Sequence, residues 1–311
     1  MDLSIVIVTW NVRDLLENCL ASIYRETRGI SFEVFVIDNG SKDGTAQMVS
    51  SKFPTVKLIR NTENKGFSYS NNLGIRKSKG RFILLLNPDT LIFRDTFLDT
   101  LIFMEHHPEC GIAGIHLLNR DYTHQDSVRR FPKFLDQALI LLKLHLVFSQ
   151  SRAMQRYVEK DFDYLVDEYG EDKGEKNFEE VNQVMGAYFM VRREVFQKIG
   201  LLDERFFVWM EEVDFCKRAY DAGFKIYYTR DAKAMHYYGA AFKQISSFRK
   251  QMIFAHSIRR YFIKHHGIAQ YALIAFLSWI SVALAAVIQI TRAKERRNVT
   301  KSYIRKEKEY I

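Results

Sequence analysis

An acidic residue that directly follows a predicted buried strand is the clearest candidate for a chemical role in this chain. The apolar run Phe82–Leu86 is followed by Asn87, Pro88 and Asp89. A short apolar run bounded by breakers predicts a strand buried on both faces. Open α/β sheets bind their ligands at the carboxyl ends of such strands. Asp89 is therefore placed where a carboxylate could hold a divalent metal and, through the metal, a diphosphate.

Other polar residues end the neighbouring predicted strands. Thr9 and Asn11 follow the first strand, and Asp38 follows the second. Because the carboxyl ends of parallel strands lie along one edge of a sheet, we expect these residues and Asp89 to line one crevice. Asp38 could accept hydrogen bonds from a base or a ribose. It could equally form an Asx turn, in which Asp bonds its own backbone.

A second acidic cluster, Glu211-Glu212-Val213-Asp214, could supply a general base. Such a base takes the proton of a hydroxyl group as its oxygen attacks. Acidic residues at a helix amino terminus are also stabilised by the helix dipole, with no part in chemistry. Asp214 and Arg218 have the spacing of an ion pair along one helix face, which explains Asp214 in that way. The two glutamates remain the candidates for the base.

The elements that must position these groups alternate along the amino-terminal third of the chain. Apolar runs predict strands, and helical spacing between the runs predicts helices, the first of them capped by Asn11. This alternation predicts an α/β fold with a mainly parallel sheet and helices on both faces. The predicted strands cover residues 3–8, 32–37, 56–59 and 82–86, with later strands over 110–118 and 181–191.

Composition and charge narrow the class of protein. The 311 residues are 47% hydrophobic and 27% charged, as in globular proteins. The net charge of +9 favours acidic partners such as nucleic acid, anionic lipid or a phosphorylated substrate. Three cysteines without metal-type spacing indicate buried thiols in a reducing compartment. The first strand begins at once, without the pattern of a signal peptide, so we expect the bulk of the protein in the cytoplasm.

The clearest change of composition lies near the carboxyl end. Residues 267–291 carry no charge, and a transmembrane helix needs roughly 20 apolar residues. Basic residues flank both ends, which opposes a single span, and Ser278, Ser281 and Gln289 weaken it further. We therefore expect a helix that lies in, or dips into, the cytoplasmic leaflet, with the apolar segment Phe134–Phe148 on the same side. The alternative is a buried core helix.

A series of short motifs runs in order through about residues 1–265. The motifs are Ser4-Ile5-Val6-Ile7-Val8-Thr9-Trp10-Asn11, Val36-Ile37-Asp38-Asn39-Gly40-Ser41, Asn64-Lys65-Gly66-Phe67, Asn71-Asn72-Leu73-Gly74, Asn87-Pro88-Asp89, Met185-Gly186-Ala187, Asp203-Glu204-Arg205-Phe206-Phe207 and Glu211-Glu212-Val213-Asp214-Phe215-Cys216-Lys217-Arg218. In this order and spacing the chain resembles the inverting glycosyltransferases of family 2, which have the GT-A fold, and especially their rhamnosyltransferase-like members. The family's D-x-D motif is N-x-D here, so Asp89 is the only carboxylate of that motif.

The resemblance implies a nucleotide-sugar donor site with one catalytic base. Asp89 is expected to hold Mg²⁺ or Mn²⁺ across the two donor phosphates, with His236 as a further metal ligand. The family places the base at the second acid of the later cluster, which is Glu212, and leaves Glu211 for sugar hydroxyls or a supporting bond. The other expected contacts are Gly186 and Asp214 at the sugar or acceptor site, and Thr9, Asn11, Asp38, Asn39, Asn64, Lys65, Gly66 and Asn87 around the nucleotide.

The loop Asn64-Lys65-Gly66-Phe67 is expected to pass near the donor. Gly66 has no side chain and would allow close backbone approach. Lys65 or Arg76 could meet phosphate charge, although a solvated basic helix face explains Arg76 better.

We expect one GT-A domain in two halves: a nucleotide-sugar half over 1–118, and a half over 119–265 with the acceptor site and the base. A membrane-associated helix and basic tail follow over 266–311. The expected reaction moves one sugar, such as rhamnose, from a dTDP- or UDP-linked donor to a lipid-linked glycan in cell-surface polysaccharide synthesis. We expect it at the cytoplasmic face of the cell membrane, against anionic lipid and without nucleic acid. The alternatives are a polyprenyl-phosphate sugar transferase and a non-enzymatic basic protein that binds membrane surfaces.

Overall fold

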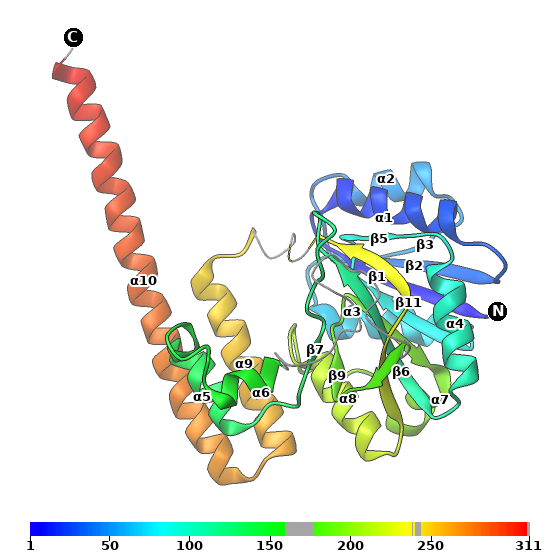
Figure 1. Cartoon of the computed structure of the whole chain (residues 1–311). Coiled ribbons are helices and arrows are strands. Elements are labelled where there is room, and N and C mark those ends of the chain that lie inside the picture. Colours follow the sequence, from blue (N-terminus) through cyan, green and yellow to red (C-terminus); the bar gives the residue numbers. More distant parts are fainter. Residues whose placement is uncertain (159–176, 238, 240–243, 310–311) are drawn as a thin grey trace.

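The computed structural model describes residues 1–158, 177–237, 239 and 244–309, with side chains as far as residue 291 except that of Leu146. A sheet covered by helices forms the main body. A group of helices lies beside it, and the last helix extends away from both (Figure 1).

Four parallel strands form the first half of the sheet, as the sequence predicts. In sheet order they are β3 (Lys57–Arg60), β2 (Phe32–Asp38), β1 (Leu3–Thr9) and β4 (Phe82–Leu86). The register sets Thr9 opposite Asp38 and Ile7 opposite Leu86. The carboxyl ends of these strands therefore lie along one edge, where the sequence places its polar candidates.

The second half of the sheet is mixed. It continues with β10 (Tyr188–Arg192), β6 (Cys110–Leu118), β11 (Lys225–His236) and β5 (Thr90–Ile92), and β8 (Phe178–Glu180) also pairs with β11. β10 runs antiparallel to both β4 and β6, and β11 runs antiparallel to β5 with His236 opposite Thr90. This last register brings the end of β11 to Asp89.

The predicted strand over residues 181–191 is two strands. The first is β9 (Gln183–Val184), which pairs with β7 (Val128–Arg129) in a separate small sheet, and the second is β10. Met185, Gly186 and Ala187 connect them.

Strand residues alternate between two apolar cores, one on each face of the sheet. From β1, Leu3, Ile5 and Ile7 face one core, whereas Val6 and Val8 face the other. The first core packs against α1 (Arg13–Glu26), α2 (Thr45–Lys52) and α4 (Thr96–His106). The second packs against α3 (Phe67–Lys77), α7 (Arg193–Ile199) and α8 (Glu211–Asp221).

A third apolar core holds the helices beside the sheet. It joins Met210 and Val213 at the start of α8 to Ile258 and Phe262 of α9 and Ile274 of α10. α9 and α10 form an antiparallel hairpin, and α5 packs against α10 (Figure 1). The helices of this region are α5 (Phe134–Leu141), the short 3₁₀ helix η1 (Leu144–Leu146), α6 (Arg152–Val158), α9 (Ser247–His265) and α10 (Ile268–Glu309).

The apolar part of α10, Ile268–Thr291, buries its two serines and exposes most of its large apolar side chains. This segment of 24 residues is long and apolar enough to cross a membrane, and only 17% of its most apolar stretch is buried. Ser278 and Ser281 are buried, and Ser281 donates a hydrogen bond to the carbonyl of Leu141. Phe276 and Trp279 are each 64% exposed. The alternative of a buried core helix is therefore wrong, and these serines do not weaken the apolar surface.

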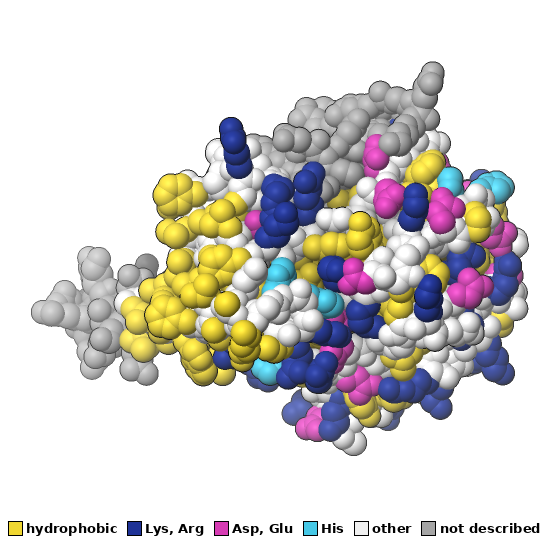
Figure 2. All heavy atoms as spheres, turned by 90° about the horizontal axis from the view of Figure 1, so that it is seen from below, with side chains coloured by type: hydrophobic (Ala, Val, Ile, Leu, Met, Phe, Trp, Pro, Cys, Tyr) yellow, Lys and Arg dark blue, Asp and Glu magenta, His cyan; other side chains and the backbone are white. Residues whose placement is uncertain are grey.

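Apolar side chains gather over this end of the molecule (Figure 2). Besides α10, the segment after α5 contributes Leu144, Val147 and Phe148, all exposed. Soluble monomers rarely expose a continuous apolar patch of this kind, and such patches mark sites of interaction with proteins or membranes.

Candidate active site

A pocket of about 600 Å³ opens at the carboxyl edge of the sheet. Ten of the fourteen predicted site residues line it, and they come from strand ends, from the loop after β3 and from the start of α8. These ten are Thr9, Asn39, Asn64, Gly66, Asn87, Asp89, Gly186, Glu211, Glu212 and His236. The four predicted residues outside the lining are Asn11, Asp38, Lys65 and Asp214.

Asp89 and His236 meet on one wall of the pocket. The Nε2 atom of His236 lies 3.3 Å from the Oδ1 atom of Asp89 and 3.3 Å from the amide nitrogen of Asn87. On the far side of the ring, Nδ1 lies 2.8 Å from Oε1 of Gln125. The amide nitrogen of Gln125 donates to Asn119 and to the carbonyl of His236. Since Oε1 can only accept, Nδ1 donates to it, and Nε2 is the ring nitrogen that faces the carboxylate of Asp89.

This donor set fits a divalent cation. One carboxylate, one imidazole with its other nitrogen hydrogen-bonded, and phosphate oxygens of a substrate are ligands that Mg²⁺ or Mn²⁺ accepts. Within the described ranges, no group of three or more His, Cys, Asp or Glu side chains is arranged to hold a metal. A metal here would therefore take its remaining ligands from substrate or water.

The loop after β3 is held by the amide of Asn39. Its nitrogen lies 3.2 Å from the carbonyl of Gly66 and 3.3 Å from Oδ1 of Asn64, and its oxygen accepts from Ser70 and Asn61. Asn39 therefore lines the pocket as the anchor of this loop. In contrast, the hydroxyl of Thr9 is buried without a hydrogen-bond partner among the described residues.

Gly66 is required by the chain's own packing. Its φ is +92°, and a Cβ atom at this position would lie 2.6 Å from the carbonyl oxygen of Phe207. The next amide, that of Phe67, donates to the same oxygen at 2.6 Å. The loop before α8 therefore makes a close backbone approach at Gly66, and the predicted approach of the donor to this residue stays a prediction.

The structure gives three of the predicted nucleotide-binding residues, Asp38, Asn11 and Lys65, partners within the chain. Asp38 is buried, and its Oδ1 accepts from the backbone of Ser41, three residues on, at 3.0 Å, a local backbone bond similar to that of an Asx turn. Asn11 does not cap α1, which begins after Val12; its side chain accepts from the backbone of Lys42. Lys65 forms an exposed ion pair with Glu63.

Glu211 and Glu212 enter the pocket at the start of α8. They follow Trp209 and Met210, whose φ values of +66° and +69° are in the left-handed region that L residues rarely adopt. One carboxylate oxygen of each glutamate is buried without a hydrogen-bond partner in the described part of the chain. Burial raises the pKa of both carboxyls, and the charge of Glu212 raises the pKa of Glu211 further. The pair is therefore suited to hold or accept a proton.

Gly186 lies beside Glu212 in the lining of the pocket. A Cβ atom on Gly186 would lie 3.8 Å from the Cβ atom of Glu212, which is ordinary contact. The position therefore tolerates a side chain sterically, and its small size leaves space beside Glu212.

Asp214 is fully buried and is not among the residues that line the pocket. It accepts from Arg218 of its own helix and from Lys264 and His265 of α9. Both of its oxygens are occupied by these side chains. Its predicted contact with the sugar or acceptor stays a prediction. The ion pair with Arg218 is the one its spacing predicts.

Several residues in or behind the pocket wall carry no sequence signal of their own. Gln125 is 111 residues from His236 in the chain, and no local pattern marks it as the partner of that ring. Trp10, Trp209 and Ile245 form apolar wall, and Lys250 of α9 is the one Lys or Arg among the described lining residues. An apolar wall with a lysine suits a substrate that has both apolar and phosphate parts.

Comparison with known proteins identifies the class that this fold and site define. The sequence model of glycosyl transferase family 2 matches residues 4–163. The chain belongs to this family, and it is a rhamnosyltransferase-like glycosyltransferase with the GT-A fold. It is 27% identical over 247 residues to the N-acetylglucosaminyl-diphospho-decaprenol L-rhamnosyltransferase of Mycobacterium tuberculosis, with 76% of each chain covered.

Two solved structures share the fold. One is a mannosyltransferase of Pyrobaculum calidifontis in complex with GDP-Man and Mn²⁺, with a TM-score of 0.55, 16% identity, and coverage of 93% of this chain and 75% of that one. The other is GalNAc-T7 with UDP, GalNAc and Mn²⁺, with a TM-score of 0.54 and 17% identity. That match covers 76% of this chain and 44% of the other.

Proposed function

We propose that this chain is a metal-dependent, inverting enzyme that moves one sugar from a nucleoside diphosphate to a lipid-linked glycan. The observation that carries the proposal is the juxtaposition, in one pocket, of the Asp89–His236 pair and the Glu211–Glu212 pair. Transfer with inversion needs a place to neutralise the leaving diphosphate and one base for the attacking hydroxyl.

Asp89 and His236 form the leaving-group side of the pocket. A bound Mg²⁺ or Mn²⁺ supplies charge neutralisation for the diphosphate. Gln125 holds the ring of His236 through Nδ1 and so directs Nε2 toward Asp89. One structure of the same fold is complexed with Mn²⁺ and GDP-Man, and the other with Mn²⁺, UDP and GalNAc, which supports a metal in this role.

Glu212 is the proposed base. A carboxyl with a raised pKa is a stronger base than an exposed glutamate, provided that it is ionised at the working pH. Glu211 is the more deeply buried of the two, and its pKa is raised by burial and by Glu212. Two adjacent carboxyls share negative charge poorly, so Glu211 retains its proton while Glu212 loses its own.

The acceptor is proposed to carry a phosphate-linked lipid. The M. tuberculosis relative is named for transfer to a diphospho-decaprenol sugar. In this chain the charge of Lys250 suits such a phosphate, and the apolar wall of the pocket suits the lipid part. The exposed apolar face of α10 suits contact with a bilayer. We place the enzyme at the cytoplasmic membrane face, where anionic lipid would attract its net charge of +9.

The donor site is tested by calorimetric titration with UDP, dTDP and GDP, with and without Mn²⁺, on the wild type and Asp89→Ala. We expect metal-dependent binding of one nucleotide, lost in the variant. The matching nucleotide sugar is then offered polyprenyl phosphate and polyprenyl-diphospho-N-acetylglucosamine, and NMR reports the anomeric configuration of the product. Absence of nucleotide binding, or retention of configuration, contradicts the proposal. Transfer to polyprenyl phosphate alone favours the polyprenyl-phosphate transferase instead.

Membrane attachment is tested by flotation with vesicles containing anionic lipid. The double substitution Phe276→Ser with Trp279→Ser removes two exposed apolar side chains of α10 and is expected to reduce binding. Tyr220→Ser is the matched control, because Tyr220 is 48% exposed on α8, away from this face. Equal binding by all three proteins contradicts a membrane contact through α10.

A further inference from the structure

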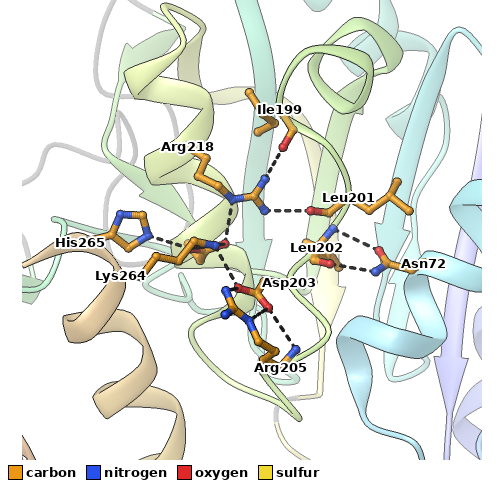
Figure 3. Close-up of polar contacts among 10 residues, drawn as sticks. Asn72, Ile199, Leu201, Leu202, Asp203, Arg205, Arg218, Lys264 and His265 are labelled. Carbon is orange, nitrogen blue, oxygen red and sulfur yellow. Dashed lines mark hydrogen bonds and ion pairs between the residues drawn. The ribbon is translucent and has the colours of Figure 1, made fainter.

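Asp214 is the centre of a buried ion cluster that joins α8 to α9 of the helical hairpin. Figure 3 shows its partners Arg218, Lys264 and His265. Lys264 approaches its Oδ1 at 2.7 Å, and the Nε2 atom of His265 lies 2.7 Å from the same oxygen. Arg218 donates to Oδ2 at 2.9 Å. Two of the three partners therefore come from the last turn of α9, immediately before the turn into α10.

The same cations hold the loop that leads into α8. Lys264 also contacts Asp203 at 3.0 Å, and Arg218 donates to the carbonyls of Ile199 and Leu201. Asn72 of α3 exchanges two hydrogen bonds with the backbone of Leu202. The cluster thus ties one loop to three helices, α3, α8 and α9, as the dashed contacts of Figure 3 show.

This loop ends in the strained turn that directs the glutamates into the pocket. Trp209 and Met210 are both left-handed, and each such residue costs on the order of 1 kcal/mol or more, which the surrounding structure must offset. The backbone amide of Asp214 donates to the carbonyl of Met210 and closes this turn. Asp214 therefore holds the turn with its backbone and α9 with its side chain.

The charge balance of the cluster supports this function. Burial raises the pKa of Asp214, but the hydrogen bond from His265 and the charges of Arg218 and Lys264 lower it by more. The carboxylate is therefore ionised at neutral pH, and an i,i+4 pair with Arg218 alone would not need Lys264 and His265 from α9. A buried carboxylate that loses one of several partners is left partly uncompensated, so its helix would shift.

We propose that Asp214 is a positioning residue for Glu211 and Glu212, and that α9 sets the geometry of the base through Lys264 and His265. The inference rests on the proposed function. Because α9 is the inner helix of the hairpin whose outer face is apolar, the surface that would contact the membrane and the catalytic base share one ion cluster.

The test compares Asp214→Asn and Lys264→Met in the full chain, with Asp221→Asn as the matched control. Asp221 forms an exposed i,i+4 ion pair with Lys217 on the same helix, away from the pocket. We expect kcat to fall by on the order of 100-fold in the first two variants, since a small misplacement of a reacting group costs about that much. The KM for nucleotide sugar and the Mn²⁺-dependent nucleotide affinity should not change, because Asp89 and His236 lie on other elements.

A charge-preserving variant and a stability measurement separate positioning from folding. Lys264→Arg keeps the positive charge and is expected to restore kcat to within a few-fold of the wild type. Thermal melting confirms that each variant is folded at the assay temperature. Wild-type kcat in folded Lys264→Met, or no restoration by Lys264→Arg, overturns the proposal. A wild type that transfers no sugar overturns the proposed function instead, so the two failures are distinguishable.

Discussion

Two pairs of titratable side chains face the same pocket, and their surroundings are opposite. Asp89 and His236 lie at the ends of paired strands, and Gln125 holds the imidazole from behind. Glu211 and Glu212 follow two left-handed residues, and one oxygen of each has no hydrogen-bond partner among the described residues. The first pair is supported by rigid sheet pairing and hydrogen bonds, whereas the second pair is desolvated and depends on a strained turn.

This difference matches the two proposed roles, in which one side of the pocket binds a cation and the other side accepts a proton. A metal ligand must stay unprotonated and correctly directed, which hydrogen bonds from behind achieve. A general base must have a pKa high enough to accept a proton, which burial achieves. Exchanging the two environments would weaken both functions.

The largest expected effect comes from removing the proposed base. Glu212→Gln should lower kcat by roughly 10²–10⁴-fold, the usual contribution of a general base. Metal-dependent nucleotide binding, measured by calorimetry, should stay at the wild-type value because the other pair is intact. Loss of nucleotide binding in this variant would show that the two pairs are not separable.

Glu211 provides a second test of the glutamate pair, through the pH dependence of kcat. Glu211→Gln replaces a carboxyl that we expect to be protonated, so it should cost much less than Glu212→Gln. Activity requires ionised Glu212, so kcat should decline as pH falls through its raised pKa, at a higher pH than for an exposed glutamate. The pH profile of kcat for both proteins checks this. An equal loss in the two variants would contradict the division of roles.

The substitution Asp89→Asn tests the Asp89–His236 pair. Loss of a metal contact is worth several kcal/mol, on the order of 100-fold or more in kcat/KM. The variant should also lose the Mn²⁺-dependent part of nucleotide affinity, which Glu212→Gln retains. Glu63→Gln is the control, because Glu63 lies in the nearby loop with an exposed partner. Unchanged Mn²⁺ dependence in Asp89→Asn would exclude Asp89 as a ligand.

Gln125→Leu tests the support of the histidine without touching the pair itself. Loss of such an outer partner typically reduces metal affinity by about 10–100-fold. Gln125→Glu keeps an acceptor for Nδ1 of His236 and should retain more of that affinity. Titration of Mn²⁺ against nucleotide binding measures both variants. Equal Mn²⁺ affinity in Gln125→Leu and the wild type would show that Gln125 does not support metal binding by His236.

The smallest effect concerns the loop that packs against the entrance to α8. Gly66→Ala combines a positive φ with a clash against the carbonyl of Phe207 and should cost about 1–3 kcal/mol of stability. Gly200→Ala is the matched control, because its φ is +79° but no atom lies within 4 Å of the added Cβ. Chemical denaturation measures both. Equal losses would mean that the contact with Phe207 is unimportant.

Local sequence patterns predicted much of the fold correctly. The four parallel strands follow from apolar runs such as Phe82–Leu86, and the pair Asp214–Arg218 follows from helical spacing. The antiparallel entry of β10 was not predictable, because no local pattern records which neighbour a strand will choose. The same holds for the partners that Asp214 takes from α9, about 50 residues away in the chain.

For α10, composition and tertiary structure each supplied a different part. The uncharged run near residues 267–291 is visible in the sequence alone, and its length predicts a helix that suits a bilayer. Composition could not show which face of α10 is exposed, because its two serines lie among large apolar residues. Packing against α5 and α9 decided it by burying Ser278 and Ser281.

The sequence by itself determined the residue types at the strand ends and the acidic cluster, because strand and helix periodicity and the ordered motifs are local properties. Only the tertiary structure decided which of them meet. The pairing of β11 with β5 places His236 beside Asp89, and the turn at Trp209 and Met210 directs Glu211 and Glu212 into the same pocket. The physical reason is that strand pairing and side-chain burial depend on contacts between residues far apart in the chain.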